Sequence, residues 1–186
     1  MIVFHTGFSE IPSPDIHVGR ANADFGQGFY LATDEDFSRR WAAERKGETT
    51  FLNRYALSTE GLAVKRFVKN KEWFDYISDN RAGRKDRFPE FDVIIGPIAP
   101  DTLYDTWGML TSGLVDVETV LRVMMLGPVY EQVVIKRERA VDALSFIDAR
   151  PLSHEEIAAF GNTVKAEEAA FQEAFANIVA GRIDDE

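Results

Sequence analysis

The stretch DFGQGFYLAT, residues 24–33, decides the fold of this chain. Two glycines precede an aromatic and apolar run, which predicts a tight turn leading into a strand over residues 28–32. Successive side chains of a strand face opposite sides, so we expect one of Phe29 and Tyr30 in the core and the other at a site. Tyr30 then offers its ring for stacking on a flat ligand. The alternative interpretation is a turn into a core strand whose aromatic rings only pack.

A second candidate segment, Phe4-His5-Thr6-Gly7, ends the apolar run of residues 2–5 that predicts the first strand. A histidine at the end of a strand can point out of the sheet edge and offer one ring nitrogen to a ligand hydroxyl. Gly7, which has no side chain, lets a ligand approach the backbone. The alternative is that His5 is satisfied inside the core or exposed in a turn.

A third candidate segment opens a late apolar strand with two polar side chains, Glu131 and Gln132. Gln132 can bridge two polar ligand groups, and Glu131 could act as a base or stabilise a cation. Because adjacent residues of a strand face opposite ways, the two side chains are not expected to share one site. The alternative is the ordinary polarity of a strand start.

The remaining pattern mixes strands and helices without a regular strand–helix–strand repeat, which favours an α+β domain with an antiparallel or mixed sheet. Thr33 is expected to cap a helix that ends near Gly47, and Ser153 with Glu156 predicts a capping box before a long helix. A loop is expected at residues 9–24, further strands at residues 49–57 and 62–67 (joined at residues 59–61), 92–98 and 129–135, and further helices at residues 71–79, 101–110, 116–125 and 138–144.

No Gly-, Ser- or Pro-rich linker divides the chain, and the nearest approach to a boundary is Arg150-Pro151. We therefore expect one domain over residues 1–150 and a C-terminal helical extension, residues 151–186, packed on it. The extension carries a partly apolar face, which packs on its own domain or forms a contact with a second copy or a partner.

Composition narrows the class of protein. The chain has 186 residues, 45% of them hydrophobic and 28% charged, which is ordinary for a globular protein. It has no cysteine, and its three histidines are too scattered for an obvious metal site, so no metal is expected. The net charge of −10 repels nucleic acid at long range, and the basic run at residues 80–87 is expected to be a solvated loop. Neither a membrane span nor a secretory signal is recognisable, so we expect a cytoplasmic protein.

Together the three candidate segments resemble an ADP-ribosyltransferase-like domain of the diphtheria-toxin and poly(ADP-ribose) polymerase type. That group carries a His near a Gly on its first strand, a Gly-x-Gly-like stretch entering a strand with a Tyr, and a late strand opening with Glu. Residues 1 to about 146 also resemble an uncharacterised bacterial domain family grouped with these transferases, with DFGxGFY, a Trp73 helix followed by Asn80-Arg81, DVIxGP and a late strand led by Gln. The resemblance implies a split antiparallel or mixed sheet with peripheral helices and a long C-terminal helix.

The resemblance also implies NAD as co-substrate and assigns roles to residues of this chain. His5 would hold a ribose hydroxyl, the Gly7 backbone would bind the nicotinamide amide, and Tyr30 would stack on the nicotinamide ring. Gln132 would occupy the place of the catalytic Glu. Arg20, from its charge and its place before the motif, would meet the pyrophosphate. The expected catalytic residues are thus His5, Tyr30 and Gln132, and the expected NAD contacts are His5, Thr6, Gly7, Arg20, Phe25, Gly28 and Tyr30.

The glutamine is a departure from the family pattern, since Gln132 offers geometry without the charge that stabilises a ribosyl cation. The resemblance therefore favours a mono-ADP-ribosyltransferase over a chain-forming polymerase, with a role as a bacterial toxin or phage-defence effector. The alternatives are an inactive NAD or ADP-ribose binding module and a protein-interaction domain that keeps only the fold. The expected partners are NAD, an acceptor macromolecule that the sequence does not identify and a cognate antitoxin, and the protein is expected as a monomer or dimer.

Overall fold

Seven strands form one mixed sheet in the computed structural model, which describes residues 1–99, 119, 122–123, 125–126 and 129–181. The strands are β1 (Ile2–Gly7), β2 (Phe29–Ala32), β3 (Phe51–Leu57), β4 (Val64–Arg66), β5 (Val93–Pro97), β6 (Glu131–Ile135) and β7 (Leu144–Pro151). Their order is β4-β5-β6-β2-β1-β3-β7, and among these strands only β4 and β5 pair in parallel. The predicted α+β class with a mixed sheet is confirmed.

Four helices belong to the described residues, namely α1 (Glu35–Arg39), α2 (Lys71–Arg81), α5 (Glu138–Val141) and α6 (His154–Val179). Among these helices, none combines the length and the apolar character that crossing a bilayer requires. The helices predicted at residues 101–110 and 116–125 lie almost wholly outside the described residues.

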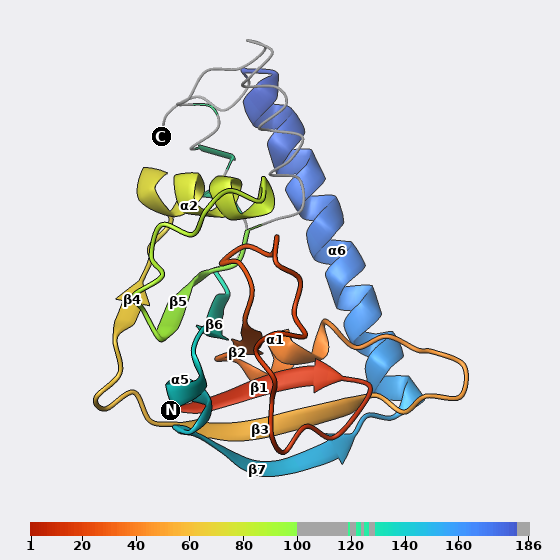
Figure 1. Cartoon of the computed structure of the whole chain (residues 1–186). Helices are drawn as coiled ribbons and strands as arrows, with labels where there is room; N and C mark the ends of the chain where they lie inside the picture. The colour runs from red at the N-terminus through yellow and green to blue at the C-terminus, as the bar shows by residue number, and fades with distance from the viewer. Residues whose placement is uncertain (100–118, 120–121, 124, 127–128, 182–186) are drawn as a thin grey trace.

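The sheet is divided between β1 and β2. These two strands share a single register pair, Phe4 with Ala32, whereas β1 shares six with β3 and β2 shares four with β6. Figure 1 shows the result: β1, β3 and β7 run across the view, while β4, β5 and β6 stand nearly upright. The two halves of the sheet therefore part from each other at β1 and β2.

One large core cluster joins the two halves, since Val3 and Tyr55 are buried in it together with Ile95 and Val133, and two further clusters each belong to one half. The helix α2 covers the β4-β5-β6 half, where Trp73 and Ile77 are fully buried beside Ile94 and Val134. On the other half, Ile157 near the start of α6 packs against a small cluster that contains Phe4. Burial of these apolar side chains stabilises the packing of α2 and α6 on the sheet, while the shared cluster holds the two halves together.

The helix α1 is shorter than predicted. It is capped by Asp34 rather than Thr33, because the Asp34 carboxylate accepts a hydrogen bond from the Phe37 N–H at 2.7 Å. It ends at Arg39 instead of near Gly47. Residues 43–49 are all exposed, so a longer helix would have no apolar face to bury against the domain.

The strands β3 and β4 confirm the predictions at residues 49–57 and 62–67, but they do not pair with each other. β3 lies between β1 and β7, whereas β4 forms the opposite edge of the sheet beside β5. The turn at residues 59–61 therefore connects two strands from different halves of the sheet.

The strand β7 was not predicted from the sequence. It pairs with β3 from Leu144 to Pro151, so the Arg150-Pro151 step lies inside a strand. From there the chain enters α6 through the predicted capping box of Ser153 and Glu156, which is confirmed. The helix α6 contacts the domain through an ion pair of Glu167, near its middle, with Arg40, and through the placement of the Arg39 guanidinium over the Phe160 ring.

Candidate functional site

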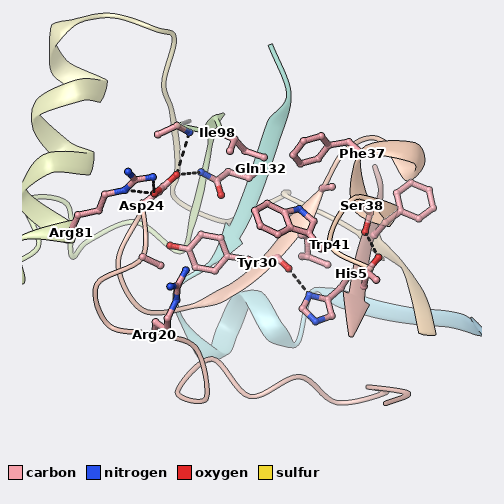
Figure 2. A pocket seen from close by; sticks show the side chains of 16 residues that line it. His5, Arg20, Asp24, Tyr30, Phe37, Ser38, Trp41, Arg81, Ile98 and Gln132 are labelled. Carbon is pink, nitrogen blue, oxygen red and sulfur yellow. Dashed lines mark hydrogen bonds and ion pairs between the residues drawn. The ribbon is translucent and has the colours of Figure 1, made fainter. Parts of the chain in front are cut away.

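A cavity of about 440 Å³ opens where β1 and β2 part (Figure 2). Its lining includes Phe4, His5 and Thr6 from β1, Tyr30, Leu31 and Ala32 from β2. The rest of the wall comes from the loop before β2, from α1 and Trp41, from the end of α2, from the residues after β5 and from Gln132 of β6. The volume lies within the range of small-molecule sites in proteins.

His5 lies in the cavity wall with one nitrogen already engaged. Its Nδ1 is 2.8 Å from the carbonyl oxygen of Tyr30, and its ring centroid is 4.6 Å from that of Phe29. Burial lowers the pKa of His5, and the bond to the Tyr30 carbonyl opposes that effect only in part. The neutral ring must donate from Nδ1 to a carbonyl, which leaves Nε2 as a hydrogen-bond acceptor.

Gly7 keeps the space beside this ring open. A Cβ atom at residue 7 would lie 3.2 Å from His5 Nε2, which is closer than most real contacts of that kind. Gly7 is not itself among the cavity-lining residues. Gly7 therefore affects the site indirectly, because the absence of a side chain leaves room for the His5 imidazole.

Tyr30 faces the cavity, and Phe29 lies in the core on the opposite side of β2, as alternation along the strand requires. The Tyr30 hydroxyl donates to the Gly26 carbonyl at 2.7 Å and accepts from the Phe25 N–H at 2.9 Å. Burial raises the pKa of Tyr30, so the phenol stays neutral. The ring is therefore held in the cavity wall by its bonds to the turn that precedes β2.

Gln132 and Glu131 are separated as predicted. Gln132 is buried and lines the cavity, next to its register partner Ala32, whereas Glu131 is exposed. The polar group that β6 brings to the cavity is thus an amide and not a carboxylate.

A carboxylate nevertheless lies beside that amide. Asp24 lines the cavity and forms an ion pair with Arg81, the last residue of α2, with an Nη2–Oδ1 distance of 2.6 Å. The side chain of Gln132 donates to the other oxygen of Asp24 at 3.4 Å. Both members of the ion pair are largely shielded from water, which strengthens their attraction.

Two exposed side chains stand at the mouth of the cavity. Arg20 makes no hydrogen bond or ion pair with any residue that the structure describes. Trp41 leaves 63% of its surface exposed although it lines the cavity. A cation and a large aromatic ring are therefore presented to any molecule that enters.

Residues 1–146 match the model of a protein family of unknown function, DUF3990. The chain belongs to this family. A search of curated proteins returns no match to the chain. The matched residues have the same extent as the resemblance noted in the sequence, residues 1 to about 146. The helix α6 lies outside the family region.

The structure does not bring three of the expected NAD contacts of this DUF3990 domain to the cavity: Gly7, described above, and the two residues Phe25 and Gly28. Phe25 is fully buried, with its ring 5.6 Å from Phe67 and 5.9 Å from Tyr76 between centroids. Gly28 lies against β6, and a Cβ there would be 2.6 Å from the Ile135 carbonyl oxygen. Both residues hold the turn before β2 in place rather than face the cavity.

Several lining residues of the DUF3990 domain were not among the expected site residues: Asp24, Phe37, Ser38, Trp41, Arg81, Ile98 and Ala99. For two of them a signal was present, since Asp24 opens the stretch quoted first and Arg81 belongs to the Asn80-Arg81 pair that carried part of the resemblance. Thr6, which was expected, lines the cavity and its hydroxyl lies 3.1 Å from that of Ser38.

The chemistry available in this cavity is hydrogen bonding, ring stacking and electrostatics. It offers paired hydroxyls at Thr6 and Ser38 and an amide at Gln132, and its wall includes His5, whose Nδ1 is engaged with the Tyr30 carbonyl. Within the described ranges, no group of three or more His, Asp or Glu side chains could hold a metal ion.

Proposed function

We propose that this DUF3990 domain binds NAD in the cavity between β1 and β2 and transfers its ADP-ribose group to an acceptor. The observation that carries the proposal is convergence: His5, Tyr30 and Gln132, from three separate segments, line one cavity. The parting of the sheet at β1 and β2 supports the resemblance to the split sheet of ADP-ribosyltransferase-like domains.

The lining suits the parts of a pyridine dinucleotide. Nε2 of His5 accepts a hydrogen bond from a ribose hydroxyl, and the Tyr30 ring packs on the flat nicotinamide ring. The guanidinium of Arg20 at the mouth is placed for the pyrophosphate, which it can bind by bidentate contacts. The phosphate groups then stay near solvent while the nicotinamide riboside half enters the cavity.

The proposed reaction breaks the bond between the ribosyl C1 and the nicotinamide nitrogen, and nicotinamide leaves with the bonding electron pair. The acceptor nucleophile forms the new bond to C1, and its proton passes to solvent. Because positive charge develops on the ribose, groups that present oxygen atoms to it lower the barrier.

A second function, NAD binding without turnover, is favoured by one observation. The side chain that β6 places in the cavity is the neutral amide of Gln132, which stabilises a ribosyl cation less than a carboxylate does. The two functions differ in whether nicotinamide appears.

The experiment that tests the proposal measures nicotinamide release from NAD by the purified protein, together with NAD binding by calorimetry. His5→Ala and Tyr30→Ala remove cavity groups, and His17→Ala removes an exposed histidine outside the cavity as a matched control. We expect release by the wild type and His17→Ala, and loss in the two cavity variants. Binding that needs His5 without any release, also with candidate acceptors present, would establish the second function. Absence of NAD binding would overturn both.

A further inference from the structure

Asp24 is surrounded by hydrogen-bond donors. Its Oδ1 accepts from Arg81 Nε at 2.7 Å and Nη2 at 2.6 Å, and its Oδ2 accepts from the Ala99 N–H at 3.2 Å and from Gln132 Nε2 at 3.4 Å. The Asn80 side chain also donates to the Asp24 carbonyl at 3.0 Å, so the end of α2 holds this residue at two points. A carboxylate only accepts hydrogen bonds, so each group that faces it must donate.

This environment decides how the Gln132 amide is turned. With the –NH₂ group toward Asp24, a donor meets an acceptor, whereas the flipped amide would set two acceptor oxygens against each other. The amide oxygen Oε1 is thereby fixed on the side away from Asp24, and Figure 2 shows it there, toward the cavity.

The amide oxygen of Gln132 receives no hydrogen bond from the residues that the structure describes. Gln132 is only 7% exposed as a residue, but its amide oxygen is not among the described buried atoms that lack a partner, so this oxygen is open to water in the cavity. A hydroxyl of a molecule in the cavity can supply the missing donor.

We propose that Asp24, held by Arg81, is a positioning residue that turns the Gln132 amide oxygen into the cavity as the acceptor for a ligand hydroxyl. The identity of that hydroxyl, a ribose hydroxyl of NAD, rests on the proposed function. The same geometry explains why residue 132 is an amide, since a glutamate there would place a second carboxylate beside Asp24.

The first arm of the test uses no ligand. Gln132→Glu is compared with the double variant Asp24→Asn/Gln132→Glu, which exchanges the acid and the amide and keeps the net charge. In Gln132→Glu, the facing Asp24 raises the pKa of the new carboxyl in the folded state above its unfolded value of about 4.3. The free energy of unfolding of Gln132→Glu is therefore highest at a pH below about 4.3, and it falls as the pH rises through the raised pKa of the folded state. The double variant should lack this loss.

The exposed Gln172 on α6 provides the matched control, because Gln172→Glu adds the same charge far from Asp24 in sequence and on the surface. Melting temperatures between about pH 4 and 8 give the profile. Identical profiles for Gln132→Glu and the double variant would overturn the positioning role, whether or not NAD binds.

The second arm titrates NAD. Gln132→Met, which keeps the shape and removes the acceptor, should weaken binding about tenfold, and Asp24→Asn should weaken it similarly because the amide orientation is no longer fixed. The exchanged pair should bind better than Asp24→Asn alone. If the wild type binds no NAD, the proposed function is wrong. The pH profiles of the first arm still test whether Asp24 positions the Gln132 amide, because they need no ligand. Unchanged affinity in Gln132→Met would overturn the acceptor role.

A wild-type measurement covers the case in which Asp24→Asn does not fold. The side-chain amide signals of Gln132, assigned by their loss in Gln132→Met, should exchange with solvent more slowly than those of Gln172, since the –NH₂ group is bonded to a buried carboxylate. Equal exchange rates would contradict the proposed orientation.

Discussion

Nδ1 of His5 lies 2.8 Å from the carbonyl oxygen of Tyr30, and this contact joins β1 to β2 at the place where the two halves of the sheet part. A side chain thus replaces a backbone bond of the sheet at the cavity wall. The contact fixes both the tautomer of the imidazole and the position of the strand that carries Tyr30.

The first prediction concerns pH. Burial lowers the pKa of His5 from its ordinary value of 6.5, so Nε2 remains an acceptor through neutral and mildly acidic pH. NAD affinity should be constant there and fall as the pH drops through the lowered pKa. Calorimetry across this range checks it, with His17→Ala as the control. An affinity that rises on acidification would mean that His5 binds as a cation.

The second prediction concerns Trp41. Its exposed ring at the cavity mouth should stack on an aromatic ring of the ligand, so NAD should quench its fluorescence. Trp73, by contrast, is fully buried and donates to the Pro97 carbonyl at 2.9 Å, so its emission should not respond.

Comparison of the wild type with Trp41→Phe isolates this signal, because Phe keeps an aromatic surface while it removes the indole emission. The quenching should disappear in Trp41→Phe, and Trp41→Ala should in addition weaken NAD binding about tenfold. Quenching that persists in Trp41→Phe would assign the contact to another tryptophan.

The third prediction concerns Arg20. Arg20→Gln should weaken NAD binding about tenfold and reduce its dependence on salt, since the guanidinium contributes a charge at the mouth. Binding of nicotinamide riboside, which has no phosphate, should be unchanged. Lys165→Gln, an exposed cation on α6, is the control for net charge. An equal loss for both ligands would place Arg20 against another part of the molecule.

The fourth prediction concerns the hydroxyl of Tyr30. Tyr30→Phe removes the bonds to the Gly26 carbonyl and the Phe25 N–H and leaves both backbone groups to find other partners. We expect a loss of about 1–3 kcal/mol in the free energy of unfolding, measured in urea, while NAD affinity changes little because the ring remains. A large loss of affinity with unchanged stability would show that the hydroxyl contacts the ligand.

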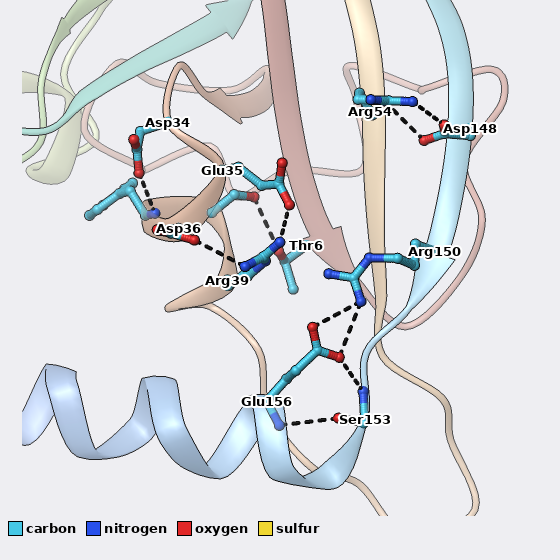
Figure 3. Close-up of polar contacts among 12 residues, drawn as sticks. Thr6, Asp34, Glu35, Asp36, Arg39, Arg54, Asp148, Arg150, Ser153 and Glu156 are labelled. Atoms are coloured by element: carbon cyan, nitrogen blue, oxygen red, sulfur yellow. Dashed lines mark hydrogen bonds and ion pairs between the residues drawn. The ribbon is translucent and has the colours of Figure 1, made fainter.

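Local patterns in the sequence were sufficient to predict several elements. The capping box of α6 lies within four residues, and Figure 3 shows Glu156 bonded to the Ser153 N–H and also to Arg150 of β7. The alternation of Phe29 and Tyr30 between core and cavity is a property of any strand, so it too followed from the sequence.

Long-range relationships were not predictable. The pairing of Asp24 with Arg81 spans 57 residues, and no local pattern marks the two side chains as partners. The edge strand β7 buries little along its length, so its apolar alternation is weak, and it becomes a strand by pairing with β3. The end of α1 depends on the lack of a surface to cover residues 43–49, which only the folded arrangement reveals.

The single register pair between Phe4 and Ala32 has a consequence for recognition. A sheet usually presents unpaired backbone groups only at its outermost strands, whereas the parting of β1 from β2 creates a second edge inside the molecule. That inner edge is held from behind by β3 and β6, so a ligand bound there as proposed would meet backbone groups that are already ordered. This preorganisation results from the backbone pairing of the strands. It should therefore persist when any one side chain that lines the cavity is replaced.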